Sequence, residues 1–191
     1  MDVAVSSAEQ HLGWRLWLLL LGVLLLSTPC LAQPVVPINL ADQRAKAVTQ
    51  VVLGILSYAR WPTEPTQLQL CVIGPTEYTD DLLKGATQSS GRPVHVRRLL
   101  TNNPTIPSDC NAVYLGKLSA QERSHLFSRL NGLAVLSISE DGNQCTVGSL
   151  FCLHISDQKV SFEVNLDSVS RSGVRIHPSV LQLSRRREAQ P

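Results

Sequence analysis

Apolar and polar residues alternate with a helical period between residues 38 and 58. The apolar positions in and just after this stretch gather on one broad stripe, formed by Leu40, Ala47, Val48, Val51, Val52, Ile55, Leu56 and Ala59. Such a stripe predicts an amphipathic helix whose apolar side packs on a core. The helix should end by Trp61, because Pro62 disfavours a helical conformation in the residue that precedes it.

Short runs bounded by turn residues predict four strands further along the chain, of which the first is buried and the second has alternating sides. They cover residues 68–73, 94–97, 112–116 and 133–137. Helices are expected between them, one over residues 78–86 and one over residues 119–130. The second begins with a capping box made by Ser119 and Glu122. Strands that alternate with helices through short links favour parallel crossovers.

The last part of the chain has a different pattern. The apolar runs 150–155 and 160–164 are separated by only four residues, 156 to 159, which predicts an antiparallel hairpin. Two short helical segments, 166–172 and 178–185, follow it. The sequence therefore predicts an α/β fold with a single domain, in which a mixed, mostly parallel sheet has helices on both faces.

The first 32 residues have the pattern of an export signal. Arg15 precedes an apolar run from residue 16 to residue 26, which is shorter than the roughly 20 residues that span a bilayer. Ala32 is a small residue that suits cleavage. We therefore expect a signal peptide at 1–32 and a mature domain at 33–191. A lipoprotein anchored through Cys30 is the alternative, although Pro29 is a poor residue before a lipid-attached cysteine.

The charge of the chain is nearly balanced, with a formal net charge of +2. A nucleic-acid-binding domain would carry a clustered basic face and a much higher isoelectric point, so no nucleic-acid partner is expected. The three consecutive arginines at 185–187 are the main charge block, and they are interpreted as a solvated tail.

The cysteines predict disulfides, because an exported chain reaches an oxidising compartment. Four remain after signal removal: Cys71, Cys110, Cys145 and Cys152. Three pairings are possible. The short loop around Gly148 favours Cys145 with Cys152, which leaves Cys71 with Cys110. The Cys145–Cys152 bridge is interpreted either as a structural bridge or as a reducible switch, since short, strained bridges are the labile ones.

Motifs for catalysis are not found in the sequence. A thiol oxidoreductase would carry a Cys-x-x-Cys motif at a helix start, and this chain has none. Cys145, Cys152 and His154 do not have the spacing of a known zinc site. Neither a Ser-His-Asp arrangement nor a glycine-rich phosphate loop can be recognised from the spacing. We therefore expect a protein that is no enzyme and uses no metal or cofactor.

Several segments together resemble the YfiR family of periplasmic repressors. They are YARWP at residues 58–62, LCVIG at 70–74, the cysteine pair around Gly148, and VSFEVNLDSVSRSGVR at 160–175. The last block is the most specific, and the resemblance covers nearly the whole mature chain. It implies a location in the periplasm.

The resemblance also implies a function and partners. YfiR-like proteins bind the periplasmic domain of an inner-membrane diguanylate cyclase of YfiN type and hold it inactive, which lowers cyclic di-GMP and biofilm formation. Release follows capture by an outer-membrane lipoprotein of YfiB type or failure of the disulfides. A homodimer is expected, because regulators of dimeric receptors commonly share their symmetry.

Five residues are nominated as surface contacts for these partners: Trp61, Glu163, Asn165, Arg171 and Arg175. Each has a structural alternative. Asn165 could cap the helix that follows it, Trp61 could bury its ring under the first helix, and Glu163 could pair with Arg171. The alternative function is a periplasmic small-ligand-binding protein with a pocket at the carboxyl edge of the sheet.

Overall fold

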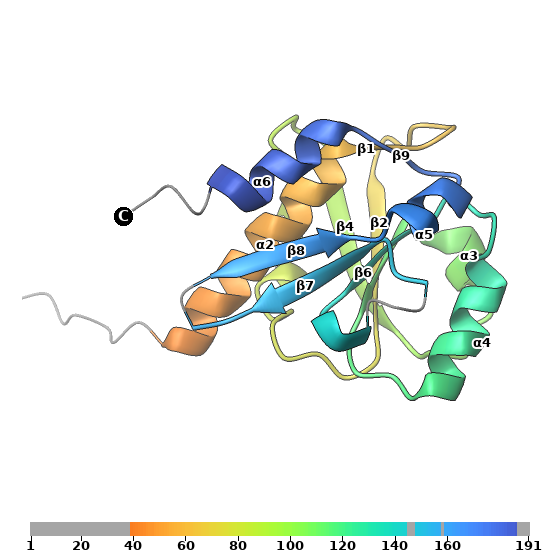
Figure 1. Cartoon of the computed structure of the whole chain (residues 1–191), viewed down its shortest axis with the longest axis horizontal. Helices are drawn as coiled ribbons and strands as arrows, with labels where there is room; N and C mark the ends of the chain where they lie inside the picture. Colours follow the sequence, from red (N-terminus) through yellow and green to blue (C-terminus); the bar gives the residue numbers. More distant parts are fainter. Residues whose placement is uncertain (1–38, 145–147, 158, 187–191) are drawn as a thin grey trace, which may run out of the picture. The chain divides into compact units, whose positions relative to one another are not determined.

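The structure of the protein is a computed structural model that describes residues 39–144, 148–157 and 159–186 (Figure 1). Its helices are α2 (Leu40–Tyr58), η1 (Leu82–Lys84), α3 (Ile106–Asp109), α4 (Ala120–Leu130), η2 (Gly142–Gln144), α5 (Leu166–Arg171), η3 (Pro178–Val180) and α6 (Leu181–Arg186). Its strands are β1 (Ala59–Arg60), β2 (Leu68–Ile73), β3 (Ala86–Thr87), β4 (Pro93–Leu99), β5 (Ala112–Leu115), β6 (Leu136–Ser139), β7 (Phe151–Ile155), β8 (Val160–Val164) and β9 (Arg175–Ile176).

Helix α2 forms where the apolar stripe predicts it. Asn39 caps its start, because the side-chain oxygen accepts a hydrogen bond from the backbone N–H of Ala41 at 3.0 Å. Asp42 lies in the first turn, where the helix dipole favours a negative charge. The helix ends at Tyr58, and the chain continues as the short strand β1.

The sheet has seven strands in the order β3-β4-β2-β5-β6-β7-β8. The five central strands, from β4 to β7, pair in parallel. The edge strands β3 and β8 pair antiparallel with their neighbours, and β8 forms the predicted hairpin with β7. A separate antiparallel ribbon joins β1 to β9. The predicted α/β fold with a mixed, mostly parallel sheet is therefore confirmed.

Two apolar cores cover the two faces of the sheet. Alternate residues of a strand point to opposite faces, so Leu70 and Val72 pack in the core that includes α2, while Cys71 and Ile73 pack in the core that includes α4. Burial of one large aliphatic side chain contributes about 1.5–3 kcal/mol. Burial on both faces explains why β2 reads as a nearly continuous apolar run.

Two predicted elements differ in the structure. The helix expected over residues 78–86 is wrong: only the single turn η1 forms, without a side-chain cap, and the chain then pairs Ala86 with Val94 of β4. The strand expected at 133–137 is displaced and begins at Leu136. The first residues of the predicted strand, from Leu133, belong to the turn after α4, because the N–H of Leu133 bonds to the carbonyl of Leu130 at 3.0 Å.

Candidate functional site

Strand β8, helix α5 and strand β9 follow one another in the chain, and we call residues 160–176 the C-terminal segment. Four of the nominated contact residues lie in it. Glu163 belongs to β8, Asn165 precedes α5, Arg171 ends α5, and Arg175 belongs to β9. The four residues therefore lie on consecutive elements of the chain: the edge strand β8, helix α5 and strand β9, which pairs with β1 outside the seven-stranded sheet.

Glu163 and Arg171 make separate ion pairs and do not pair with each other. Glu163 Oε1 lies 3.1 Å from Nε2 of His154 across the β7–β8 hairpin. Arg171 Nη1 lies 2.6 Å from Oδ2 of Asp167 within α5. The side chains of Glu163 and Arg171 are 66% and 58% exposed, respectively. Because exposed pairs contribute little to stability, both charges can change partner at small cost.

Asn165 and Arg175 have different surroundings. The side-chain oxygen of Asn165 accepts a hydrogen bond from the N–H of Ser168 at 2.9 Å, so this residue caps α5. Arg175 is exposed and lies opposite Arg60 in the β1–β9 ribbon. Arg60 donates to the carbonyl of Ala59 at 2.7 Å. Two guanidinium groups on facing positions give this ribbon a local positive charge.

Trp61 is not at the surface. Its side chain is only 4% exposed and packs in the core that includes α2. The indole N–H donates to the carbonyl oxygen of Asn111 at 3.0 Å. Burial of the ring with a satisfied indole N–H corresponds to the structural alternative. Trp61 is therefore corrected from a surface contact to a core residue.

An apolar feature of the C-terminal segment was missed from the sequence. Leu166, the first residue of α5, is 73% exposed. A hollow of about 450 Å³ lies between the end of α4 and α5, and its lining includes Leu133 and Arg171. A single exposed leucine is normal on a protein surface, so Leu166 does not by itself mark a binding site. The helix-capping signal Asn165-Leu166 was visible, but the pattern alone could not give the exposure of the leucine.

At the carboxyl edge of the sheet, the loops after the central strands contact one another. Strand order reverses between β2 and β5, and ligands of open α/β sheets bind in the crevice at this position. A Cβ added to Gly116 would overlap the carbonyl oxygen of Pro75, so the loops after β5 and β2 are in direct contact there. Arg98 donates to the carbonyl of Gly74 and to Oγ1 of Thr76, both at 2.9 Å. Hollows of about 310 Å³, beside Glu77 and Glu140, and about 600 Å³, beside Pro75 and Arg98, remain next to these contacts, so the small-ligand alternative stays a prediction.

Glu140, just after β6, holds the same loop from the other side. Its carboxylate accepts from the N–H of Glu77 at 2.7 Å, from the N–H of Tyr78 at 3.3 Å and from the hydroxyl of Tyr114 at 2.9 Å. Burial, together with the Glu140 charge and hydrogen bond, raises the pKa of Tyr114 far above its ordinary value. Tyr114 thus stays a proton donor to Glu140 at neutral pH.

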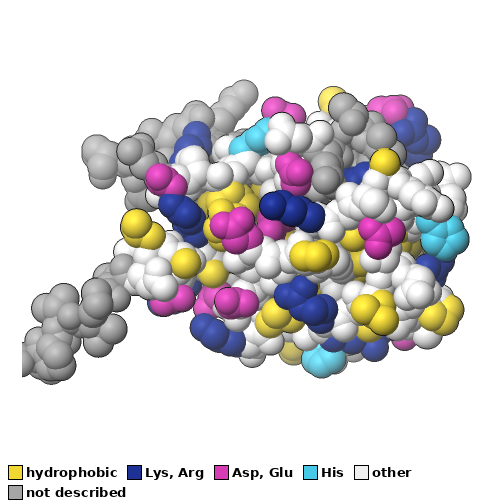
Figure 2. Space-filling model, turned by 90° about the horizontal axis from the view of Figure 1, so that it is seen from below, with side chains coloured by type: hydrophobic (Ala, Val, Ile, Leu, Met, Phe, Trp, Pro, Cys, Tyr) yellow, Lys and Arg dark blue, Asp and Glu magenta, His cyan; other side chains and the backbone are white. Residues whose placement is uncertain are grey.

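Figure 2 shows the molecule from the side on which α4 begins. Acidic and basic side chains are interspersed on this face, and apolar side chains are scattered between them. Interspersed charges give no strong field of one sign over this face.

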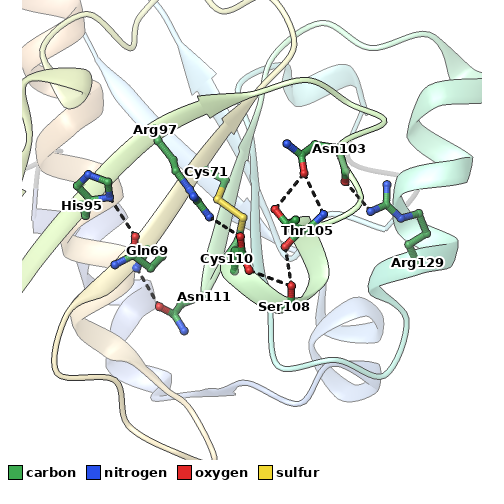
Figure 3. Close-up of polar contacts among 11 residues, drawn as sticks. Gln69, Cys71, His95, Arg97, Asn103, Thr105, Ser108, Cys110, Asn111 and Arg129 are labelled. Atoms are coloured by element: carbon green, nitrogen blue, oxygen red, sulfur yellow. Dashed lines mark hydrogen bonds and ion pairs between the residues drawn. A yellow bond between two sulfur atoms is a disulfide. The ribbon is translucent and has the colours of Figure 1, made fainter.

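Cys71 and Cys110 form a disulfide with a Cα–Cα distance of 5.9 Å, as the sequence predicts (Figure 3). The bridge joins the middle of β2 to the end of α3. Beside it, Nη2 of Arg97 in β4 pairs with Oδ2 of Asp109 at 3.1 Å. Hydrogen bonds from Thr105 and Ser108, and then the Arg97 guanidinium, hold the pKa of Asp109 below its ordinary value.

Cys152 lies in β7, is fully buried and is disulfide-bonded. Cys145, its predicted partner, lies outside the described residues, so the Cys145–Cys152 pairing stays a prediction. Cys152 faces Glu163 directly in the β7–β8 ladder.

A family model, described as YfiR/HmsC-like, matches residues 45–185 of the chain. The chain belongs to the YfiR/HmsC-like family. The match includes the whole seven-stranded sheet, the four cysteines at positions 71, 110, 145 and 152, and the entire C-terminal segment. Membership makes the protein a periplasmic regulator of diguanylate cyclase signalling in the general sense.

The YfiR/HmsC-like family is regulatory and not catalytic. Within residues 39–144, 148–157 and 159–186, the structure contains no group of three metal-ligating side chains that could hold an ion. Over the same part of the chain, no helix has the length and apolar character needed to cross a membrane. Arg98 and Glu140 could not be recognised from the sequence, because single charged residues at the ends of strands have no motif that sets them apart.

Proposed function

We propose that this protein is a negative regulator that binds the periplasmic domain of an inner-membrane diguanylate cyclase of YfiN type and represses cyclic di-GMP synthesis. The family match over residues 45–185 carries the proposal, because it covers the fold and the surface to which the function is assigned. Capture by an outer-membrane lipoprotein of YfiB type releases the cyclase. The disulfide state of the protein changes the strength of repression.

Repression requires only differential binding. A regulator shifts a receptor toward the inactive conformation when it binds that conformation more tightly than the active one. The lipoprotein relieves repression by competing for the free regulator. No chemistry on the regulator is needed for either step.

The C-terminal segment is the proposed contact surface. Glu163 and Arg171 present charges whose partners, His154 and Asp167, are themselves exposed. Arg175 lies opposite Arg60, and the exposed Leu166 of the same segment adds an apolar group. Interfaces commonly combine a central apolar contact with arginines. Asn165 contributes by capping α5 and so fixes the position of Leu166.

Isothermal calorimetry tests the proposal. The mature oxidised protein is titrated into the purified periplasmic domain of a YfiN-type diguanylate cyclase from the same organism. We expect stoichiometric binding that Leu166→Asp together with Arg171→Glu weakens by more than tenfold, since a charge replaces an apolar contact and the sign of a second charge reverses. Leu40→Asp, a change at another exposed leucine, is the matched control and should bind like the wild type. No binding by the oxidised wild type would contradict the proposed function.

The protein is further proposed to act as a homodimer, which matches the symmetry of a dimeric cyclase. Sedimentation equilibrium of the mature chain tests this, and a monomer at all concentrations used in the binding experiment would contradict it.

A further inference from the structure

Arg123 is a buried arginine on α4 that the proposed partner surface does not use. It is only 4% exposed and follows the helical spacing of the buried residues Leu126 and Leu130. Its Nη1 donates to Oγ of Ser149 at 3.1 Å, and its Nη2 donates to Oγ of Ser139 at 3.0 Å. The guanidinium therefore bridges two segments that are separate in sequence: the end of β6 and the chain before β7.

Burying a charged side chain costs hydration free energy, which indicates that Arg123 has a specific role at this position. Burial lowers the pKa of Arg123, and the nearby charge of Asp141 opposes that shift. The guanidinium still remains charged at neutral pH. It also lies over the ring of Phe127, with 5.7 Å between the guanidinium carbon and the ring centre.

The segment that leads into β7 is held from two sides. A Cβ on Gly148 would overlap the ring of Phe127, so this residue packs directly on α4. On the other side, the N–H of Leu150 bonds to the carbonyl of Ser137 at 3.1 Å and to its Oγ at 3.0 Å. Residues 148–150 are thus fixed between α4 and β6 two residues before Cys152.

Arg123 also touches the residue that lies opposite Cys152. Ser139 and Cys152 are partners in the parallel β6–β7 register. Through Ser139 and Ser149, one side chain therefore contacts both the strand next to Cys152 and the chain that runs to it. We call Arg123, Phe127, Ser139 and Ser149 the clamp. These residues contact the chain that leads into β7 and the strand beside it.

We propose that Arg123 is the positioning residue that makes the disulfide of Cys152 resistant to reduction. The proposal rests on the Cys145–Cys152 bridge of the proposed function. Closing a disulfide requires ordering the chain between its cysteines, and any contact that orders part of this chain in advance favours the bridged form. The clamp orders residues 148–150, which lie inside that short loop, and so shifts the thiol–disulfide equilibrium toward the bridge.

Lysine cannot replace arginine in this clamp. The planar guanidinium directs two N–H groups to two separate hydroxyls, whereas an ammonium is a single compact charge on a flexible stem. Arg123→Lys therefore keeps the charge and loses the bridging geometry. It is the most conservative variant that tests the positioning role.

The experiment is a redox titration of the mature protein with mixtures of reduced and oxidised dithiothreitol. Reduced dithiothreitol supplies two electrons and two protons, the S–S bond opens to two thiols, and the reagent closes to its cyclic disulfide. Alkylation and mass spectrometry then give the reduced fraction of each cysteine. Peptide mapping without reduction first identifies the partner of Cys152, and a partner other than Cys145 would overturn both the proposed bridge and this inference.

Once the bridge is established, we expect Arg123→Lys to shift the thiol–disulfide equilibrium of Cys152 about three- to tenfold toward the thiols. This shift is a fraction of the effect of losing a charged hydrogen bond. Gly148→Ala, which displaces residue 148 from Phe127, should shift it in the same direction. Arg129→Lys is the matched control, because Arg129 lies on the same helix and donates to the carbonyl of Asn103 outside the clamp.

The Cys71–Cys110 bridge is an internal reference in every sample. An unchanged equilibrium for Cys152 in both clamp variants would overturn the inference while leaving the proposed function intact. An equal shift of both bridges would also overturn it, because that result indicates a general loss of stability. A shift confined to Cys152 supports it.

Discussion

Single charged side chains fix the loop after β2 at the carboxyl edge of the sheet. Glu140 accepts hydrogen bonds from two consecutive backbone N–H groups, those of Glu77 and Tyr78, and from Tyr114. Arg98 binds the same loop on its other side through Gly74. Backbone groups in a loop that crosses the sheet need partners, and these two side chains supply them. One carboxylate and one guanidinium therefore fix the loop after β2 at the carboxyl edge of the sheet.

Glu140→Gln tests this role. The amide keeps the shape of the side chain but removes the charge, and its NH₂ group cannot accept the hydrogen bonds that one carboxylate oxygen accepts. We expect the free energy of unfolding to fall by about 1–3 kcal/mol, as for loss of a charged hydrogen bond. Urea denaturation followed by circular dichroism measures it.

Glu163→Gln is the control for Glu140→Gln. It removes a carboxylate of the same kind from an exposed pair with His154 and should change the free energy of unfolding by less than about 1 kcal/mol. Equal effects of the two variants would argue against a special role for Glu140.

At the scale of elements, Asp109 links α3 to β4 through Arg97, next to the Cys71–Cys110 bridge. The pKa of Asp109 is lowered in the folded protein, first by Thr105 and then by Ser108 and Arg97. A lowered folded-state pKa means that the carboxylate stabilises the fold above its ordinary pKa, near 3.8, and that this contribution is lost as the pH falls through the lowered value.

Asp109→Asn should therefore be less stable than the wild type at pH 7, and the difference should shrink as the pH falls below about 4. Thermal unfolding of both proteins over a series of pH values measures this. Asp167→Asn removes an exposed carboxylate within α5 and serves as the control. A difference between wild type and Asp109→Asn that stays constant down to pH 2 would rule out the proposed linkage.

The elements that the sequence predicted are those with a repeated pattern. The stripe of α2, the apolar run of β2 and the Ser119–Glu122 capping box each determine local structure from neighbouring residues. The capping box is formed in the structure, with both reciprocal hydrogen bonds present. The strands β1 and β9 were missed, because two residues carry no period and their pairing depends on the rest of the fold.

The candidate site was predictable only in part, and for a related reason. Glu163, Arg171 and Arg175 came from a resemblance that located the block but not the direction of each side chain. Trp61 illustrates the limit, since an aromatic residue after a helix suits a core as well as an interface. Arg123 carried a usable signal, a charge at a helical position shared with buried leucines, but the groups it contacts come from distant segments.

At the scale of the whole molecule, the two predicted bridges lie in different parts of the sheet. Cys71 is in β2, near the β3 edge, and its bridge closes a separation of 39 residues. Cys152 is in β7 and is paired directly with Glu163 of the C-terminal segment. The first bridge therefore starts from a strand four places from β8, while the second starts from the strand that pairs with β8.

This separation predicts different effects for the two pairs. Changing Cys71 and Cys110 together to serine should lower the free energy of unfolding by about 4 kcal/mol on the loop-entropy model, with little change in affinity for the cyclase domain while the protein stays folded. Changing Cys145 and Cys152 together should weaken that binding, because loss of the bridge frees the strand that positions Glu163.

Chemical denaturation and calorimetry on the same preparations separate the two effects. Binding is measured at a temperature at which circular dichroism shows each variant to be folded, so that a loss of affinity cannot come from unfolding. If the Cys71–Cys110 variant lost affinity as strongly as the Cys145–Cys152 variant, the contact surface would have to extend toward the β3 edge. The position of a disulfide in the sheet, and not only its presence, therefore determines whether its reduction changes the affinity for the partner.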